Sequence, residues 1–366
     1  MDTKDPNVKY IAEGSFGCVF SSKIQCRESN LMISKGNKKY VSKVSVVSQD
    51  KMIDKEILLG KMIVKNIENY DYYFAPILNS CPINIGVIED NEIKRCEIVS
   101  KDKDSSQKEY ISSTLKYVGK NSICEYLNTR QKNEKKHVKA ILETHLHLTK
   151  ALQKLLDLED SIIHYDLKDG NIIFDDEYNV PIIIDYGLSF TKSQLFFTPL
   201  SIENLEKVFY VYYEKYSAWN IDVVLLSYIT QSIIIEENLN VAHQVLQPYY
   251  EKLINVVDDF VAGSILFDTN EERSKFTYNT KKYLSKFEKK TIRILIDELS
   301  QRWKSWDNYS IAVMYYIYLL DNKYLEENKY IILYRMLLKE IIHSTFDRER
   351  HEPMRTYESI ILLSRL

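Results

Sequence analysis

The spacing of apolar residues changes near Gly119, and this change limits the folds open to the chain. Residues 8–47 alternate apolar and polar side chains around turn residues, which predicts strands joined by a hairpin. Residues 138–158, VKAILETHLHLTKALQKLLDL, repeat apolar residues every three or four positions, which predicts a long amphipathic helix. The sequence therefore predicts an α+β protein in which a strand-rich part precedes a helical part.

The strand-rich part is predicted to cover residues 1–118, and the helical part residues 119–366. From about residue 200 onward, few glycines or prolines interrupt the helical pattern. No linker rich in Pro, Gly or Ser separates the parts, so we expect one enzyme-like domain of two lobes with a cleft between them. Within the first part we predict a helix at residues 51–66 and short strands at residues 83–90, 95–101 and 109–118.

Composition disfavours several classes of protein. The formal net charge is −3 over 366 residues, which disfavours a constitutive nucleic-acid binder. A locally basic run, residues 130–139, is either a solvated helix start or a phosphate-binding patch. The start of the chain lacks the apolar stretch of a signal peptide, and the longest apolar run, residues 223–235, is too short to span a bilayer. We therefore expect a soluble intracellular protein with no membrane span.

The cysteines give a second indication of compartment. The chain has five of them, and none forms a short paired spacing such as C-x-x-C. An odd count without such spacing predicts reduced thiols in a cytosol-like compartment and no zinc site. The five are Cys18, Cys26, Cys81, Cys96 and Cys124.

Two glycines mark the turn of the first predicted hairpin. In the segment IAEGSFGCVF, Gly14 and Gly17 lack a Cβ, so backbone N–H groups there can approach phosphate oxygens closely. A two-glycine hairpin is also common as a plain turn. The segment alone therefore leaves both interpretations open.

Lys43 lies in the middle of a predicted strand among apolar residues. A lone ammonium at such a position is costly unless it has a partner. Glu56, on the helix that follows, is suitably placed to pair with it, and a lysine held by a helix glutamate can contact the α- and β-phosphates of a nucleotide. The alternative is that Lys43 faces solvent on the polar side of the strand.

The segment HYDLKDGN, residues 164–171, concentrates polar chemistry in a short loop. Asp166 can accept the proton of an incoming hydroxyl, and Lys168 can neutralise charge on a transferring phosphoryl group. Asn171 offers an amide oxygen to a metal ion. Downstream, the apolar run III ends in Asp185, which is an oxygen ligand of the kind that Mg²⁺ prefers.

In their joint order these segments resemble the eukaryotic-type protein kinase family. AEGSFGCV resembles its glycine loop, YVSK its lysine strand, HYDLKDGN its catalytic loop and DYG its D-F-G motif. The resemblance covers at least residues 8–190 and implies a bilobal kinase fold with ATP and Mg²⁺ as cofactors. It implies a phosphate-covering loop formed by Ala12, Gly14, Ser15, Phe16, Gly17 and Val19.

The same resemblance assigns the remaining roles. Asp166 is expected to be the catalytic base, assisted by Lys168, while Asn171 and Asp185 hold the metal. An ion pair of the strand lysine with the helix glutamate is expected at the phosphates. Backbone groups near two residues of the hinge-like segment LKYVGKNSICEYL are expected to meet adenine, namely Lys116 and Val118.

The chain departs from the family pattern in the region after DYG. Tyr165 stands where the family usually has an arginine, and no A-P-E motif follows. Two aspartates are candidates for the buried brace of the catalytic loop, and we favour Asp307 in SWDNYS over Asp222 in NIDVV. Residues 190–300 then replace the usual activation segment with an unusually long and mostly helical region.

The D-L-K form of the loop resembles the serine/threonine branch of the family, so we expect proteins with Ser/Thr hydroxyls as substrates and a monomeric enzyme. The late WDNYS and the missing A-P-E resemble kinases of large DNA viruses, of the giant-virus and poxvirus type. Such a kinase would be located in the host cytoplasm or the virion. Two alternatives remain open at this point. They are a pseudokinase scaffold that binds nucleotide or partner proteins, and a small-molecule phosphotransferase.

Overall fold

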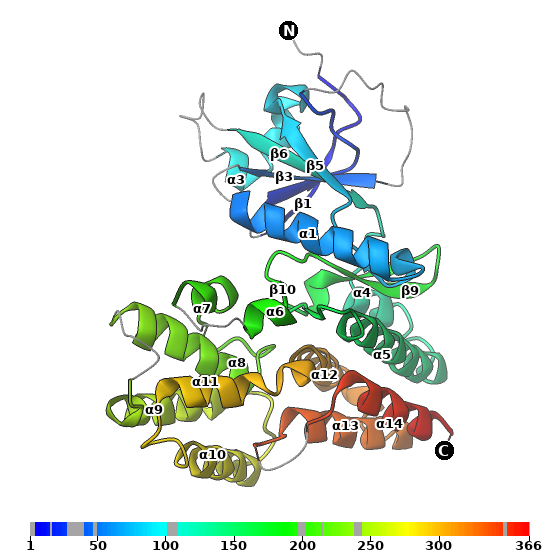
Figure 1. Ribbon diagram of the computed structural model, residues 1–366. Coiled ribbons are helices and arrows are strands. Elements are labelled where there is room, and N and C mark those ends of the chain that lie inside the picture. Colours follow the sequence, from blue (N-terminus) through cyan, green and yellow to red (C-terminus); the bar gives the residue numbers. More distant parts are fainter. Residues whose placement is uncertain are drawn as a thin grey trace. The chain divides into compact units, whose positions relative to one another are not determined.

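The chain forms two compact units in the computed structural model (Figure 1). The first unit consists of residues 1–120 and 173–187, and the second of residues 121–172 and 188–366. The first unit thus extends beyond the predicted residues 1–118, because a strand from the later segment pairs with a strand of the earlier one. The structure describes residues 4–14, 17–27, 40–46, 50–100, 109–196, 202–213, 215–237, 244–346 and 350–365.

A five-stranded antiparallel sheet is the frame of the first unit, in the order β1-β2-β3-β6-β5. The predicted hairpin is confirmed, since Gly14 and Gly17 lie opposite each other at its end. A Cβ at Gly17 would lie 2.5 Å from the carbonyl oxygen of Val44, so glycine lets β2 and β3 approach. The strands are β1 (Tyr10–Gly14), β2 (Gly17–Phe20), β3 (Tyr40–Val46), β5 (Asn79–Ile83) and β6 (Tyr110–Lys116).

Helix α1 (Asp50–Asn66) confirms the helix predicted for residues 51–66. Its buried positions Ile53, Glu56, Leu59 and Ile63 recur every three or four residues, so they form one face toward the protein interior. One of these four is a glutamate. A buried carboxylate on an otherwise apolar face requires a partner, which the sheet provides. The first unit also contains a small sheet in the order β4-β9-β8, made of Phe74–Ala75, Val180–Ile184 and Ile172–Asp175.

Two predicted strands of the first unit are wrong. Residues 95–101 contain a short helix, α3 (Glu97–Ser100), because Glu13 of β1 accepts hydrogen bonds from the first backbone N–H groups of that turn. Only the start of residues 83–90 is in a strand. The side chain of Asn84 accepts a hydrogen bond from the backbone N–H of Gly86 and so starts a helical turn. The short helix α2 (Asp90–Ile93) follows.

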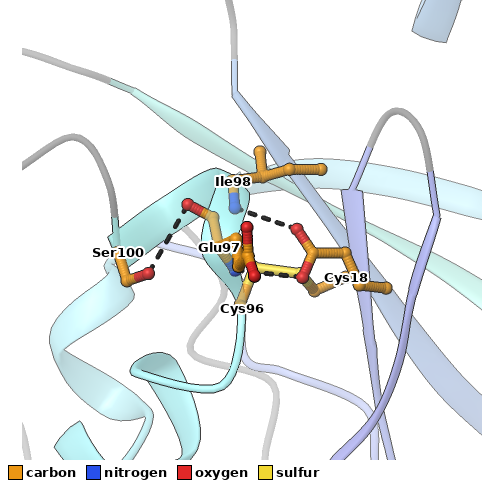
Figure 2. Close-up of a disulfide and its surroundings, with 6 residues drawn as sticks. Cys18, Cys96, Glu97, Ile98 and Ser100 are labelled. Carbon is orange, nitrogen blue, oxygen red and sulfur yellow. Dashed lines mark hydrogen bonds between the residues drawn. A yellow bond between two sulfur atoms is a disulfide. The ribbon is translucent and has the colours of Figure 1, made fainter.

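The structure contradicts the prediction that all cysteines are reduced. Cys18 is bonded to Cys96 and Cys26 to Cys81, at sequence separations of 78 and 55 residues. Figure 2 shows the first of these disulfides beside Glu97 and Ile98 at the start of α3. The fold of the first unit brings these distant cysteines together, so their spacing in the sequence does not indicate which of them pair. The inference of a reducing compartment from cysteine spacing therefore no longer holds.

The second unit is mainly helical, as predicted. Helix α5 (Glu134–Leu156) covers most of the predicted residues 138–158, and α12 (Trp306–Asp321) lies almost wholly in the interior. Helices α12 and α14 (Pro353–Arg365) pack on α5, and α13 (Lys329–Ile342) packs on both α12 and α14. Two short strands, β7 (Ile162–Ile163) and β10 (Phe190–Thr191), pair beside this bundle, and the short helix α4 (Ile123–Asn128) precedes α5.

Between β10 and α12 the chain forms consecutive helices, as predicted for residues 190–300. Helix α8 continues directly into a π-helix. Helix α9 packs on α8 and α10, and α11 packs on α8. None of the helices in the described ranges is both long and apolar enough to cross a membrane. These elements are α6 (Lys192–Leu195), α7 (Ile202–Val208), α8 (Ile221–Tyr228), the π-helix (Ile229–Ile235), α9 (Tyr250–Val261), α10 (Asn270–Leu284) and α11 (Ile292–Ser300).

The disulfides predict a definite count of reactive thiols. Alkylation of the denatured protein without reductant should label only Cys124, the free cysteine. After reduction, all five cysteines should be labelled. The measurement is intact mass followed by peptide mapping. Label on Cys18 or Cys26 before reduction would contradict the structure.

Candidate functional site

In the first unit, Lys43 lies between two carboxylates. Its Nζ donates to Glu56 Oε2 at 3.2 Å and to Asp185 Oδ1 at 3.0 Å. Lys43 is 8% exposed and Glu56 is 4% exposed, so this is an interior ion pair rather than a surface one. Burial lowers the pKa of Lys43, but the two carboxylates more than offset that effect and raise it, so the lysine is charged. The alternative that Lys43 faces solvent is wrong.

Each of these three side chains is placed by a different element. Lys43 is flanked in the sheet by Val19 of β2 and Ser113 of β6, and Glu56 belongs to the buried face of α1. Asp185 directly follows β9 and has a φ of 60°, in the left-handed region. A strained residue that ends a strand and points at a buried lysine is more typical of a functional position than of a simple connection.

The glycine hairpin presents mixed features. Ala12 pairs with Val19 across β1 and β2, and Ala12 and Gly14 are exposed. A Cβ at Gly14 would lie 3.8 Å from the backbone oxygen of Gly17, which is an ordinary contact distance, so steric crowding does not require glycine there. Two other predicted loop residues, Ser15 and Phe16, lie outside the described residues.

The hinge-like segment holds a network of its own. Lys116 ends β6 opposite Tyr40, and its Nζ donates to Asp175 Oδ2 and to the backbone oxygen of Asp71, both at 3.3 Å. Val118 packs against the small sheet of the first unit. The side chain of Lys116 therefore fixes the end of β6, and the expected contact of backbone groups there with adenine stays a prediction.

In the second unit, the loop of residues 163–171 arranges donors around Asp166. Lys168 Nζ donates to Asp166 Oδ2 at 2.9 Å, and Asn171 Nδ2 donates to the same oxygen at 3.0 Å and to the backbone oxygen of Asp166 at 2.8 Å. Asp166 is 9% exposed. Two donors on one carboxylate oxygen and a third bond to the backbone oxygen fix the orientation of Asp166, which a general base requires. The predicted set of Asp166, Lys168 and Asn171 is thus brought together.

A residue that the sequence did not indicate completes this set. The hydroxyl of Tyr216 donates to Asp166 Oδ1 at 2.5 Å. Burial and the nearby carboxylate raise the pKa of Tyr216, so the phenol is neutral and keeps its proton. No sequence motif contains this tyrosine. It contacts Asp166 only because a turn 50 residues later in the chain lies against the loop.

Asp307 holds the backbone of the loop. Its Oδ2 and Oδ1 accept hydrogen bonds from the N–H groups of His164 and Tyr165 at 2.7 and 2.8 Å. The choice of Asp307 over Asp222 as the brace is therefore confirmed. Asp222 is fully buried and pairs instead with Arg350, whose Nη2 lies 2.9 Å from its Oδ1.

Tyr165 is an aromatic anchor of the same loop. It has a φ of 71°, an unusual value for a bulky residue, and its hydroxyl lies 3.1 Å from Ser227 Oγ of α8. Its ring contacts Phe190 and Trp219, and the indole N–H of Trp219 donates to the backbone oxygen of Tyr165 at 2.9 Å. Burial raises the pKa of Tyr165, so this anchor is uncharged.

The oxygen atoms of Asn171 and Asp185 are suitable ligands for a hard cation such as Mg²⁺. Asn171 uses its amide hydrogens on Asp166, which leaves the amide oxygen as its remaining metal-binding atom. Asp185 carries a carboxylate that is about one-third exposed and that binds Lys43 through one oxygen. Oxygen atoms of carboxylates and amides are the ligands that Mg²⁺ takes, so each residue, within its own unit, suits the predicted role.

Comparison with known proteins gives no independent family assignment. No protein-family model matches the chain, and no curated protein matches it. The interpretation of the site therefore depends on the motifs and on the contacts described above.

The brace predicts a measurable loss of stability. In Asp307→Asn the side chain keeps one acceptor oxygen, and its NH₂ group faces a backbone N–H that has lost its partner. The free energy of unfolding should fall by about 1.5–3 kcal/mol, the usual contribution of a hydrogen bond to a charged group. Urea unfolding measures this change. Asp321→Asn, at the exposed end of the same helix, is the matched control, and equal stability of the two variants would contradict the role of Asp307.

Proposed function

We propose that the chain is a bilobal protein kinase that transfers the γ-phosphoryl group of ATP to serine or threonine hydroxyls of proteins. The observation that carries this proposal is the meeting of Lys43 with Glu56 and Asp185, since the last is 142 residues away from the lysine. The motifs predict these residues as one functional set. A charged lysine fixed between two carboxylates is suited to contact nucleotide phosphates.

In the proposed reaction, the acceptor oxygen attacks the γ-phosphorus of ATP. The new O–P bond forms while the bond from the γ-phosphorus to the β–γ bridging oxygen breaks, and ADP leaves with that bond's electron pair. The acceptor's proton passes to Asp166. Lys168, already in contact with Asp166, offsets charge on the transferring group.

The proposal assigns Mg²⁺ to Asn171 and Asp185. When bound, the ion neutralises charge on the nucleotide phosphates. The residues of the chain orient the reactants: Asn171 fixes Asp166 through two hydrogen bonds, and Lys43 fixes Asp185. The loss of any of these contacts should therefore reduce transfer.

One observation favours the alternative of a scaffold. The carboxylate that would act as the base is already hydrogen-bonded to Tyr216, so the position of an acceptor hydroxyl is taken. A scaffold, however, has no chemical need for Lys43, Asp166, Asn171 and Asp185 together. We therefore retain the kinase as the primary proposal, with the scaffold as the second candidate.

The base is tested by Asp166→Asn. Transfer of labelled γ-phosphate from Mg·ATP to casein, a protein with many Ser/Thr acceptors, should fall by about 10²–10⁴-fold, while binding of Mg·ATP is nearly unchanged. Asp176→Asn, an exposed aspartate in the turn between β8 and β9, is the control and should transfer normally. Unchanged transfer in Asp166→Asn would show that another group is the base. Tight Mg·ATP binding without transfer to any acceptor would favour the scaffold.

The phosphate contact is tested by Lys43→Met. Because this change leaves Glu56 buried without its cation, both the stability and the affinity for Mg·ATP should fall. Breaking a buried pair in this way typically costs about 3–5 kcal/mol. Unfolding and nucleotide binding should be measured together, with Lys65→Met, at the exposed end of α1, as control. Unchanged nucleotide affinity in a folded Lys43→Met protein would exclude the proposed contact.

A further inference from the structure

Among the described residues whose side chains donate to the Asp166 carboxylate, Tyr216 is the one that the proposed reaction does not use. It lies in the turn before α8, where its backbone oxygen accepts from the N–H of Trp219 at 3.0 Å. The next residues are firmly held: Ser310 Oγ of α12 donates to the backbone oxygen of Ala218, and Trp219 is buried. These contacts fix the backbone of the turn, and the turn places the phenol of Tyr216 against Asp166.

The geometry of this contact is that of an acceptor with its base. The O–H of Tyr216 donates to Asp166 Oδ1, the oxygen that neither Lys168 nor Asn171 contacts with its side chain. A nucleophile within hydrogen-bond reach of a general base is the arrangement that proton abstraction requires. The length of the side chain matters as well. A serine on this backbone would not reach Asp166, because its hydroxyl is one carbon from Cα rather than beyond a ring.

We propose, on the basis of the proposed kinase function, that Tyr216 is a site of intramolecular phosphorylation and that this modification frees Asp166 for other acceptors. Tyr216 Oη attacks the γ-phosphorus of ATP, so that an aryl phosphate O–P bond forms as the bond to the β–γ bridging oxygen breaks. ADP leaves, and the phenolic proton passes to Asp166. The acceptor position is then one that takes a tyrosine as well as serine or threonine.

The modification has a clear electrostatic consequence. A phosphotyrosine carries about −1.5 to −2 charges at pH 7, which would repel the Asp166 carboxylate that now binds the phenol. Space is present for the ring to move, because a cavity of about 380 Å³ borders Tyr216 and Lys168. Its wall is completed by apolar residues of α12, including Val313, Met314 and Ile317. Phosphorylation therefore exposes the base, and the unmodified chain is held in a self-occupied state.

The direct test needs no variant. Full-length protein is incubated with Mg·ATP, and mass spectrometry of its peptides should find phosphate on Tyr216. Labelling of casein should show a lag that prior incubation with Mg·ATP removes. Tyr216→Phe should lack both the modification and the lag, whereas Tyr213→Phe, an exposed tyrosine in the same segment, should behave as the wild type.

The intramolecular route is tested by mixing. Wild-type chain is incubated with an isotopically heavy Asp166→Asn chain, and label at Tyr216 of the heavy chain should be lower by at least about 100-fold. Equal label on both chains would overturn the intramolecular step. Casein labelled without a lag, with Tyr216 unmodified, would overturn this inference and leave the kinase proposal standing. No transfer to casein or to Tyr216 would overturn both.

Discussion

The site in the second unit depends on two hydrogen bonds that the Asp307 carboxylate accepts from the backbone N–H groups of His164 and Tyr165. Burial raises the pKa of this aspartate, and the backbone N–H groups of His164 and Tyr165 act in the opposite direction. Two backbone N–H groups directed at one carboxylate fix the start of the loop. Because Asp166 and Asn171 follow in the same loop, their orientation depends on this contact.

Aromatic contacts strengthen the same loop from its other side. The ring of Tyr165 lies among Phe190 and Trp219, and the indole of Trp219 returns a hydrogen bond to the backbone of Tyr165. An arginine at this position would offer a charge to an incoming phosphate. A buried tyrosine offers only packing and a hydroxyl contact with Ser227, so the loop is held by built-in contacts. This arrangement agrees with a form of control that acts on Asp166 itself, through Tyr216.

The sequence motifs predicted much of the site. The features that they did not predict depend on contacts between residues far apart in the sequence. The pair of Lys43 with Glu56 was predictable because a buried ammonium requires a partner, whereas the contact of Asp185 with the same lysine was not, since sequence predicted Asp185 only as a metal ligand. The pairing of Cys18 with Cys96 was not, since it depends on the strand β2 and the turn before α3 meeting across the first unit. The helix α3 likewise replaced a predicted strand, because a carboxylate from β1 caps its N–H groups.

Tyr216 illustrates the same limit for function. The chain has 28 tyrosines, and sequence gives no reason to single out one of them. Only the turn anchored by Ala218 and Trp219 brings this hydroxyl to Asp166. Helical periodicity, in contrast, predicted α5 and the late helices well, because burial of one apolar face is a local property of the sequence.

The central claim is that the residues around Lys43 and those around Asp166 act on one nucleotide. It is tested most directly by nuclear magnetic resonance of the full chain, titrated with ATP carrying paramagnetic Mn²⁺ in place of Mg²⁺. The account predicts that amide signals near Asp185 and near Asn171 broaden together and saturate at the same nucleotide concentration. Broadening confined to one of these two sets would contradict it.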